Sequence, residues 1–130
     1  MSTTAPAGFR AAGVAAGLKS SGDPDVALVV NDGPHDVAAA VFTTNRFPAA
    51  PVQWSRQVLQ DGRLRAVVLN SGGANACTGV EGFQDTHATA ERLAAAVGDS
   101  AGEIAVCSTD RKSTRLNSSH RSLSRMPSSA

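Results

Sequence analysis

The chain has 130 residues, of which 42% are hydrophobic and 18% charged, as expected for one globular domain. Its apolar runs are far too short to cross a membrane, its start does not resemble a signal peptide, and two cysteines do not suggest a disulfide framework. Residues 1–109 carry 7 Lys and Arg against 10 Asp and Glu (−3), and residues 110–130 carry 5 against 1 (+4), which gives the net charge of +1. We therefore expect a cytoplasmic protein without a membrane partner, in which Cys77 and Cys107 are small buried side chains.

The first half of the chain predicts short strands joined by turns. Residues 8–19 contain three glycines, which argue against a stable helix and favour an irregular strand. Two apolar runs, residues 26–30 and 36–45, flank the turn sequence Asn-Asp-Gly-Pro at 31–34, and this spacing predicts an antiparallel hairpin. Residues 52–59 are expected to open as a strand and pass into a short helix.

The second half predicts two strands and one long helix. Residues 66–69 are apolar at every position, as in a buried strand, and residues 103–109 predict a last strand. Residues 82–97 show an apolar stripe with helical spacing, and Gly98 is a natural helix end. The stripe consists of Phe83, His87, Ala90, Ala94 and Val97. The predicted fold class is therefore α/β, a mixed sheet with packed helices.

A polar turn rich in Gly and Asn, residues 70–79, connects the buried strand to the long helix. Glycines in such a turn let backbone N–H groups approach a ligand closely. The spacing Gly72-Gly73-x-Asn75 matches neither a phosphate-binding loop nor a dinucleotide fingerprint. On its own the turn therefore predicts no more than a tight structural connection.

Four blocks of sequence, taken together and in order, resemble a known family. They are Gly8-Phe-Arg-Ala-Ala-Gly-Val-Ala-Ala-Gly-Leu-Lys19, Ala40-Val-Phe-Thr-Thr-Asn45, Val68-Leu-Asn-Ser-Gly-Gly-Ala-Asn-Ala-Cys-Thr-Gly79 and Cys107-Ser-Thr109. The family is that of the ornithine acetyltransferases, also called glutamate N-acetyltransferases or ArgJ, and the resemblance is to its N-terminal part. Four ordered blocks are far more specific than one Gly-rich turn.

This resemblance implies an acyltransferase of arginine biosynthesis that moves an acetyl group from N-acetylornithine to glutamate, and acetyl-CoA is a further possible substrate. Family precursors cut themselves ahead of a threonine, and the two pieces stay together as an αβ assembly. The freed threonine is the nucleophile, with its own amine as a nearby base. No cofactor and no metal are expected. The nucleophile lies downstream in family members and has no match in this chain, so the fragment itself should be inactive.

The resemblance also assigns roles to residues of this chain. Thr109 matches the threonine of a Thr-Gly pair that forms part of the oxyanion hole, but the following residue is Asp110 instead of glycine. A carboxylate there would place negative charge where negative charge develops. Substrate-binding candidates come from the polar turn, and two interpretations stay open for its asparagines, which either shape the substrate pocket or brace the turn. These candidates are Asn70, Gly72, Gly73 and Asn75.

Three regions follow from these observations. Residues 1–7 are expected to be a frayed N-terminus, and residues 8–109 a truncated ArgJ-like domain. From Asp110 onward the sequence resembles the translation of a common sequencing-library adapter. We therefore expect residues 110–130 to be an artefactual, disordered tail, and its basic charge is no sign of a nucleic-acid partner.

Other side chains that could carry chemistry have simpler explanations. His87 on the helix stripe is expected to be structural, His35 to be solvated, and Cys77 to be a small turn residue. Turn chemistry is enough to explain four neighbouring carboxylates without a cation site. They are Asp23, Asp25, Asp32 and Asp36.

The alternative function is a non-catalytic module that binds a small ligand through residues 70–79. It predicts a monomeric unit whose stability rises with ligand. The family interpretation instead predicts marginal folding, because sheet edges and apolar patches would lack the rest of the protein.

Overall fold

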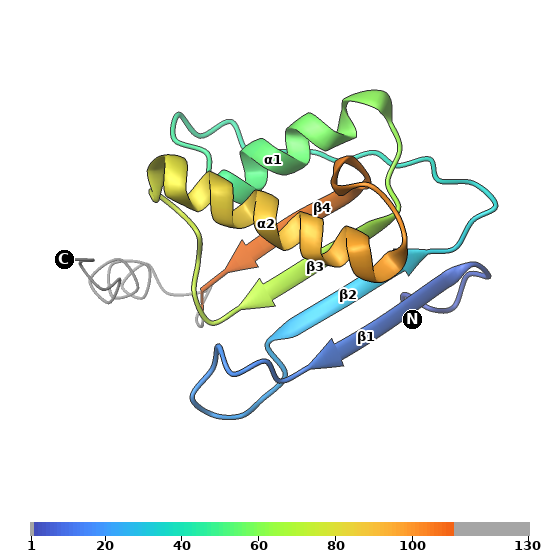
Figure 1. Ribbon diagram of the computed structural model, residues 1–130, viewed down its shortest axis with the longest axis horizontal. Coiled ribbons are helices and arrows are strands. Elements are labelled where there is room, and N and C mark those ends of the chain that lie inside the picture. The colour runs from blue at the N-terminus through green and yellow to red at the C-terminus, as the bar shows by residue number, and fades with distance from the viewer. Residues whose placement is uncertain (1, 111–130) are drawn as a thin grey trace.

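The computed structural model describes residues 2–110 of the chain. Four strands form one sheet in the order β1-β2-β3-β4, and Figure 1 shows the two α-helices on one face of it. The elements in chain order are β1 (Phe9–Val14), β2 (Val26–Asn31), α1 (Ala50–Val58), the short 3₁₀ turn η1 (Leu59–Asp61), β3 (Ala66–Ser71), α2 (Gly79–Val97), the 3₁₀ turn η2 (Ala101–Glu103) and β4 (Ile104–Thr109). β2 pairs antiparallel with both β1 and β3, whereas β3 and β4 are parallel. The predicted mixed α/β architecture is confirmed.

The core lies between the sheet and the two helices. Alternate residues of a strand point to opposite faces, so one set from each strand meets the helices. Trp54 of α1 stands at the centre of this layer, and its ring lies 6.0 Å from that of Phe83 of α2. The buried cluster consists of Val30, Trp54, Ala66, Val68, Ala90, Ala94, Ile104 and Val106.

The predicted hairpin between residues 26–30 and 36–45 is wrong. Residues 36–45 contain no strand, and the single bridge there joins Val37 to Arg63. β2 has two edges, and β1 and β3 occupy them both, so no place is left for a third partner. The hairpin of this sheet is formed by β1 and β2 instead.

The helices differ from prediction in their starts and in one buried face. α1 begins at Ala50 with a proline in its first turn. Residues 52–58 are therefore helical from the start, so the prediction that 52–59 opens as a strand is wrong. α2 begins at Gly79 and ends at Val97. Gly98 stops it as predicted, with a φ of 75° and an N–H that donates to the Ala94 carbonyl. The buried residues of α2 are Gly82, Thr86, Ala90 and Ala94. Ala90 and Ala94 belong to the predicted stripe, whereas Gly82 and Thr86 are buried in place of the predicted Phe83 and His87.

His87 and the cysteines lie at the surface. The His87 ring packs 4.9 Å from the Trp54 ring and 3.7 Å from the Glu91 carboxylate, which agrees with a structural role. Cys77 and Cys107 are both exposed, so the expectation of buried cysteines is wrong. Cys107 follows Val106, which faces the core, and therefore points to the opposite face of β4.

The outer edge of β4 is covered by two side chains of α1. The Trp54 indole N–H donates to the Ile104 carbonyl at 2.9 Å. The Ser55 hydroxyl donates to the Val106 carbonyl at 2.9 Å and accepts from the Val106 N–H at 3.0 Å. These three bonds occupy backbone groups that would otherwise pair with another strand.

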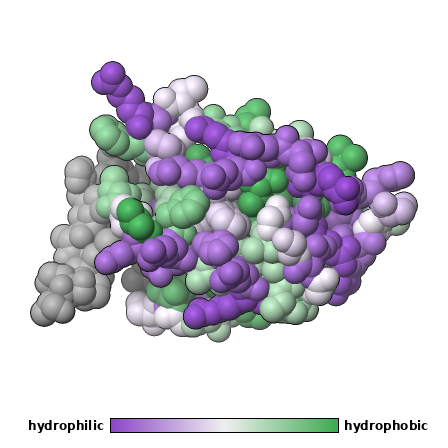
Figure 2. Space-filling view, turned by 45° about the horizontal axis from the view of Figure 1, so that its top comes forward, coloured by the Kyte–Doolittle hydropathy of each residue, from purple (hydrophilic) through white to green (hydrophobic). Residues whose placement is uncertain are grey.

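The space-filling view shows that burial of the apolar residues is incomplete. Hydrophobic patches interrupt the hydrophilic surface in Figure 2. The large apolar side chains with the highest exposure are Val37, Val41, Phe47 and Val80. Within residues 2–110, no helix combines the length and apolar character needed to cross a membrane.

Candidate functional site

The residues predicted to form the site meet at the C-terminal ends of β3 and β4. Because β3 and β4 are parallel, their C-terminal ends lie side by side, with Asn70 opposite Ser108 and Ser71 opposite Thr109. The N–H of Gly72 donates to the Thr109 carbonyl at 3.1 Å, which fixes the polar turn to the end of β4. Ligands of open α/β sheets bind at the carboxyl ends of the strands.

Asn75 braces the polar turn with every polar group it has on its side chain. Its amide nitrogen donates to the Gly82 carbonyl at 2.7 Å and to the Thr86 hydroxyl at 3.0 Å. Its amide oxygen accepts from the Thr78 hydroxyl. Of the two interpretations left open by the sequence, the contacts of Asn75 therefore favour the bracing role.

Ser108 joins the same turn to β4. Its hydroxyl donates to the Gly73 carbonyl at 3.0 Å and accepts from the Asn75 N–H at 3.2 Å. The sequence analysis did not single out Ser108, although it lies beside Thr109 in the Cys-Ser-Thr block. Its contacts hold Thr109 in register with the turn.

Asn70 and Thr109 point to opposite faces of the sheet. Ala66 and Val68 face the helices, so Asn70, two residues further along β3, does the same, whereas Thr109 alternates with the core-facing Val106 and Ser108. The Asn70 Oδ1 atom is buried and has no hydrogen-bond partner among residues 2–110. The two candidates thus lie one register position apart in the ladder, and their side chains do not line one surface.

The packing of the turn requires glycine at position 72 but not at position 73. Gly72 has a φ of 123°, and a Cβ at this position would lie 3.0 Å from the Leu18 carbonyl oxygen. Gly73 faces open space, with no atom within 4 Å of a Cβ built there. Glycine is therefore needed at position 72 for the close approach of the loop between β1 and β2.

Asp25 fixes that loop against the site and was assigned only to turn chemistry by the sequence analysis. It is 5% exposed, and its carboxylate accepts the N–H groups of Ala16 at 2.6 Å and Lys19 at 2.9 Å. Its backbone carbonyl accepts the N–H of Ser71 at the end of β3. The hydrogen bonds from Ala16 and Lys19 hold the pKa of the Asp25 carboxyl below its ordinary range, although desolvation opposes them.

The loss of stability at acidic pH is expected to depend on Asp25. Since its pKa is lowered in the folded chain, its contribution is complete well above the unfolded pKa of about 3.9. That contribution is lost as the pH falls through this value toward the lower folded pKa. Urea midpoints measured from neutral pH downward should therefore fall less steeply for Asp25→Asn than for the unaltered chain.

Asp23→Asn is the matched control for this experiment. The Asp23 carboxylate accepts one bond from the exposed Ser21 hydroxyl and makes no contact with the N–H groups of the loop. This variant should follow the pH dependence of the unaltered chain. The same slope in all three proteins would contradict the role assigned to Asp25.

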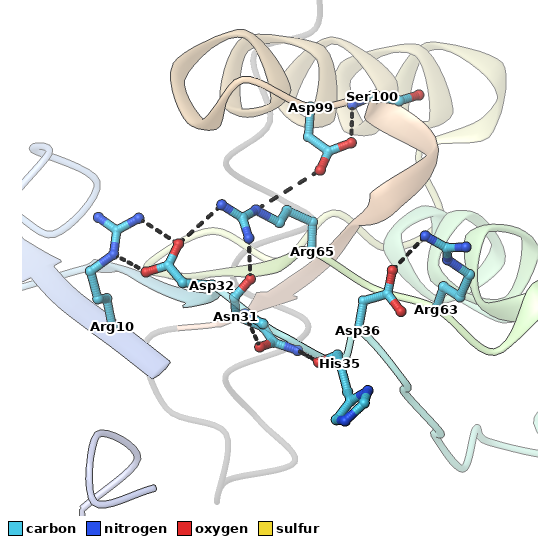
Figure 3. A network of polar contacts seen from close by, with 10 residues as sticks. Arg10, Asn31, Asp32, His35, Asp36, Arg63, Arg65, Asp99 and Ser100 are labelled. Carbon is cyan, nitrogen blue, oxygen red and sulfur yellow. Dashed lines mark hydrogen bonds and ion pairs between the residues drawn. The ribbon is translucent and has the colours of Figure 1, made fainter. Parts of the chain in front are cut away.

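The opposite end of the sheet carries a network of ion pairs, which Figure 3 shows in close view. Asp32 lies between two guanidinium groups, with Arg10 Nη2 at 2.9 Å and Arg65 Nη2 at 3.0 Å from its Oδ1. Arg65 also approaches Asp99 at 3.9 Å. Arg10 chiefly, and Arg65 to a smaller extent, lower the pKa of Asp32. The network joins β1, the end of β2, the start of β3 and the end of α2.

The four carboxylates of the N-terminal third do not gather around a common point. Asp36 pairs with Arg63 at 2.5 Å, whereas Asp23, Asp25 and Asp32 have the separate partners described above. Local loop chemistry accounts for the carboxylates of Asp23 and Asp25, whereas those of Asp32 and Asp36 pair with distant parts of the chain. Within residues 2–110, no group of three or more His, Cys, Asp or Glu side chains is placed to hold a metal ion. His35 is exposed, as predicted.

The expectation of an artefactual tail concerns residues 110–130, and all of these except Asp110 lie outside the described residues. Asp110 directly follows β4. The expected oxyanion partner of Thr109 is therefore replaced at the edge where the candidate site lies.

Comparisons with known proteins place most of the chain beside one family. The model of the ArgJ family matches residues 10–122. The arginine biosynthesis bifunctional protein ArgJ of Thermobifida fusca is 69% identical over 116 residues, which cover 89% of this chain and 30% of that protein. The protein of the same name from Streptomyces coelicolor is 68% identical over 109 residues, 84% of this chain and 28% of its own length. This chain thus spans less than a third of either relative.

Two solved structures share the fold. The ornithine acetyltransferase of Mycobacterium tuberculosis, solved in complex with ornithine, matches with a TM-score of 0.81 and 62% identity, over 88% of this chain and 62% of that one. The arginine biosynthesis bifunctional protein ArgJ of Bacillus halodurans matches with a TM-score of 0.76 and 31% identity, over 91% of this chain and 61% of that one.

Proposed function

This chain belongs to the ArgJ family, and we propose that it is the N-terminal part of a bifunctional N-acetyltransferase of arginine biosynthesis. The observation that carries the proposal is the identity of 69%, over 89% of the chain, to an arginine biosynthesis bifunctional protein. The identity of 62% to a solved ornithine acetyltransferase supports the reaction type. The proposed reaction moves an acetyl group from N-acetylornithine to glutamate, and acetyl-CoA is proposed as a second acetyl donor. No observation favours the alternative of a stand-alone binding module.

In this proposal the described domain supplies the oxyanion side of the site. A threonine in the part of the protein that this chain does not span attacks the acetyl carbonyl, and negative charge develops on the carbonyl oxygen. Preorganised donors at that oxygen lower the barrier. Thr109 suits this role because the Gly72 N–H bond and the Ser108 contacts hold the end of β4 in one position.

Further properties of the whole protein belong to the same proposal. We propose that the precursor cuts itself ahead of the nucleophilic threonine, that the two pieces form an αβ assembly, and that the enzyme acts in the cytoplasm without a metal or other cofactor. Asn70, Gly72, Gly73 and Asn75 are proposed to shape the substrate side of the edge through the turn that they form. The position of this turn beside Thr109 supports that assignment.

A chimeric enzyme tests the proposal. Residues 1–109 of this chain would be joined to glycine and then to the remaining sequence of the Thermobifida fusca relative, and acetyl transfer from N-acetylornithine to glutamate would be measured. We expect activity within about tenfold of the unaltered relative, because the two N-terminal parts are 69% identical. Keeping Asp110 in place of glycine should lower kcat by about 100-fold or more, the cost typical of a lost oxyanion donor.

Two further measurements complete this test. Thr109→Ala in the glycine-containing chimera should also lower kcat while leaving the melting temperature nearly unchanged, since Thr109 is exposed. A folded glycine-containing chimera without acetyl transfer would refute the proposed function. Reading the genomic locus across the codons for Thr109 and Asp110 would show directly whether glycine follows Thr109 in the gene.

A further inference from the structure

Residues 36–43, called here the α1-flanking segment, are held in place at both ends. At its start, the Asp36 carbonyl accepts the Leu64 N–H at 2.9 Å, and the Ala38 N–H donates to the Gly62 carbonyl at 2.8 Å. At its end, Arg56 of α1 donates to the Thr43 carbonyl at 3.0 Å. The Arg56 guanidinium also lies 5.5 Å from the centre of the Phe42 ring. The segment therefore has a defined path across the domain.

The α1-flanking segment contains the strand-forming residues Val37, Val41, Phe42 and Thr43, but its middle has no strand partner among residues 2–110. Residues 39–41 make no backbone hydrogen bond to any residue from 2 to 110. Val37 is 81% exposed and Val41 is 99% exposed, although valine is a typical residue of half-buried strands. Local sequence preference and final structure usually agree in natural proteins. The disagreement here indicates a pairing partner that residues 2–110 do not provide.

An apolar cavity lies next to the same segment. Its volume is about 400 Å³, and it separates residues 38–43 from α1 and from the sheet. The sheet contributes Val67, Ala105 and Cys107, which alternate with the core-facing residues of β3 and β4. A cavity with such walls is suited to apolar side chains of an added element.

We propose that residues 37–42 become a β-strand in the full-length protein, by pairing with a strand from the part that this chain does not span, and that Val37 and Val41 are buried in that contact. The relatives provide the length for such a partner, since this chain covers 30% of the Thermobifida fusca protein and 62% of the Mycobacterium tuberculosis chain. The inference rests on the proposed function only in requiring a longer ArgJ-type protein.

Amide hydrogen exchange tests this pairing. The chimera with the Thermobifida fusca sequence would be compared with the 130-residue chain, and exchange would be followed by mass spectrometry on peptides that cover residues 37–43. We expect exchange of these amides to be at least about 100-fold slower in the chimera, because strand pairing protects amides that are otherwise open to water. Equal exchange rates in the two proteins would overturn the proposal.

A pair of substitutions tests the burial of Val41. Val41→Asp should lower the melting temperature of the chimera by several degrees, since it would bury a carboxylate in an apolar contact. Val80→Asp is the matched control, because Val80 is 75% exposed and lies in the first turn of α2, where a carboxylate is favourable. Val80→Asp should leave the melting temperature within about one degree of the unaltered chimera.

The remaining outcomes each have one meaning. Protection of residues 37–43 in the 130-residue chain at high concentration, together with the mass of a dimer, would make a second copy the partner and refute the proposal. An equal loss of stability in both Asp variants would also refute it. An active chimera with unprotected residues 37–43 would leave the acetyltransferase proposal standing and remove only this inference.

Discussion

Trp54→Ala is expected to lower the free energy of unfolding by about 3–5 kcal/mol, the usual cost of truncating a buried tryptophan. Trp54 is 8% exposed and lies in the core cluster, with the Phe83 and His87 rings against it. The substitution also leaves the Ile104 carbonyl without its indole donor, which adds about 1–3 kcal/mol if water does not replace it. Domains of this size are stable by roughly 5–15 kcal/mol, so the variant should be largely unfolded if the chain is near the lower limit.

Urea denaturation followed by far-UV circular dichroism measures this effect, and Trp54→Phe separates its two parts. Phenylalanine keeps most of the ring contacts but has no N–H for Ile104. We expect its loss to be about 1–3 kcal/mol, clearly smaller than that of alanine. An alanine variant that unfolds at the same urea concentration as the unaltered chain would show that Trp54 does not organise this core.

Gly82→Ala is the second substitution with a large expected effect. We expect it to lower the stability of the folded chain, whereas this exchange within a helix usually raises it. Alanine in place of glycine within a helix normally stabilises by about 1 kcal/mol. Here the new Cβ would lie 1.7 Å from the Thr78 hydroxyl oxygen and 2.4 Å from the Asn75 amide oxygen. The Thr78 Cβ, also at 2.4 Å, cannot rotate away because it is bonded to the backbone. Overpacking of this kind costs about 1–3 kcal/mol or more, which outweighs the gain in helix propensity.

The consequences of Gly82→Ala should reach the candidate site. Asn75 would lose its bond to the Gly82 carbonyl, and the turn that it braces is fixed to Ser108. In the glycine-containing chimera, a displacement of about 1 Å at the end of β4 should lower kcat by about 100-fold. Gly13→Ala in β1 is the control, because Gly13 lies outside the candidate site and a Cβ there would make only an ordinary contact of 3.9 Å with the Val26 carbonyl oxygen. If both variants have the same melting temperature and the same kcat, the close packing at Gly82 does not affect the candidate site.

Much of the sheet could be predicted because its signals are local. An apolar run as dense as residues 66–69 has few alternatives to a buried strand, and the positive φ of Gly98 matches the helix end that glycine favours. The contact between the polar turn and Thr109 follows from the pairing of β3 with β4, which the sequence left as a condition. The path of residues 36–45 could not be predicted, because strand pairing depends on partners far away in the sequence.

The buried face of α2 shows why the phase of a helix is harder to predict than its existence. Large side chains dominate a hydrophobic pattern, so the sequence favoured the line through Phe83 and His87. The buried residues are instead small ones, with Gly82 and Thr86 against Asn75 of the polar turn and Ala90 in the core cluster. The larger rings then pack at its flank against Trp54.

The candidate site was predicted in outline, but its supports were not. Thr109 and the polar turn could be found from the resemblance, since the blocks contain them. Asp25 and Ser108 carry no motif, and their importance comes from hydrogen bonds to backbone groups. The Asp25 carboxylate binds its own loop and its carbonyl binds the end of β3, whereas Ser108 binds the polar turn. Such bonds depend on the tertiary structure and leave no periodic signal in the sequence.

The bonds from Trp54 and Ser55 to β4 have a consequence for self-association. An open strand edge is a template on which further chains can add and start aggregation. Along Ile104 and Val106 that template is already occupied by side chains that belong to the same molecule. At high concentration, sheet-to-sheet growth of this domain should therefore begin at β1, whose outer edge has no such cover from residues 2–110.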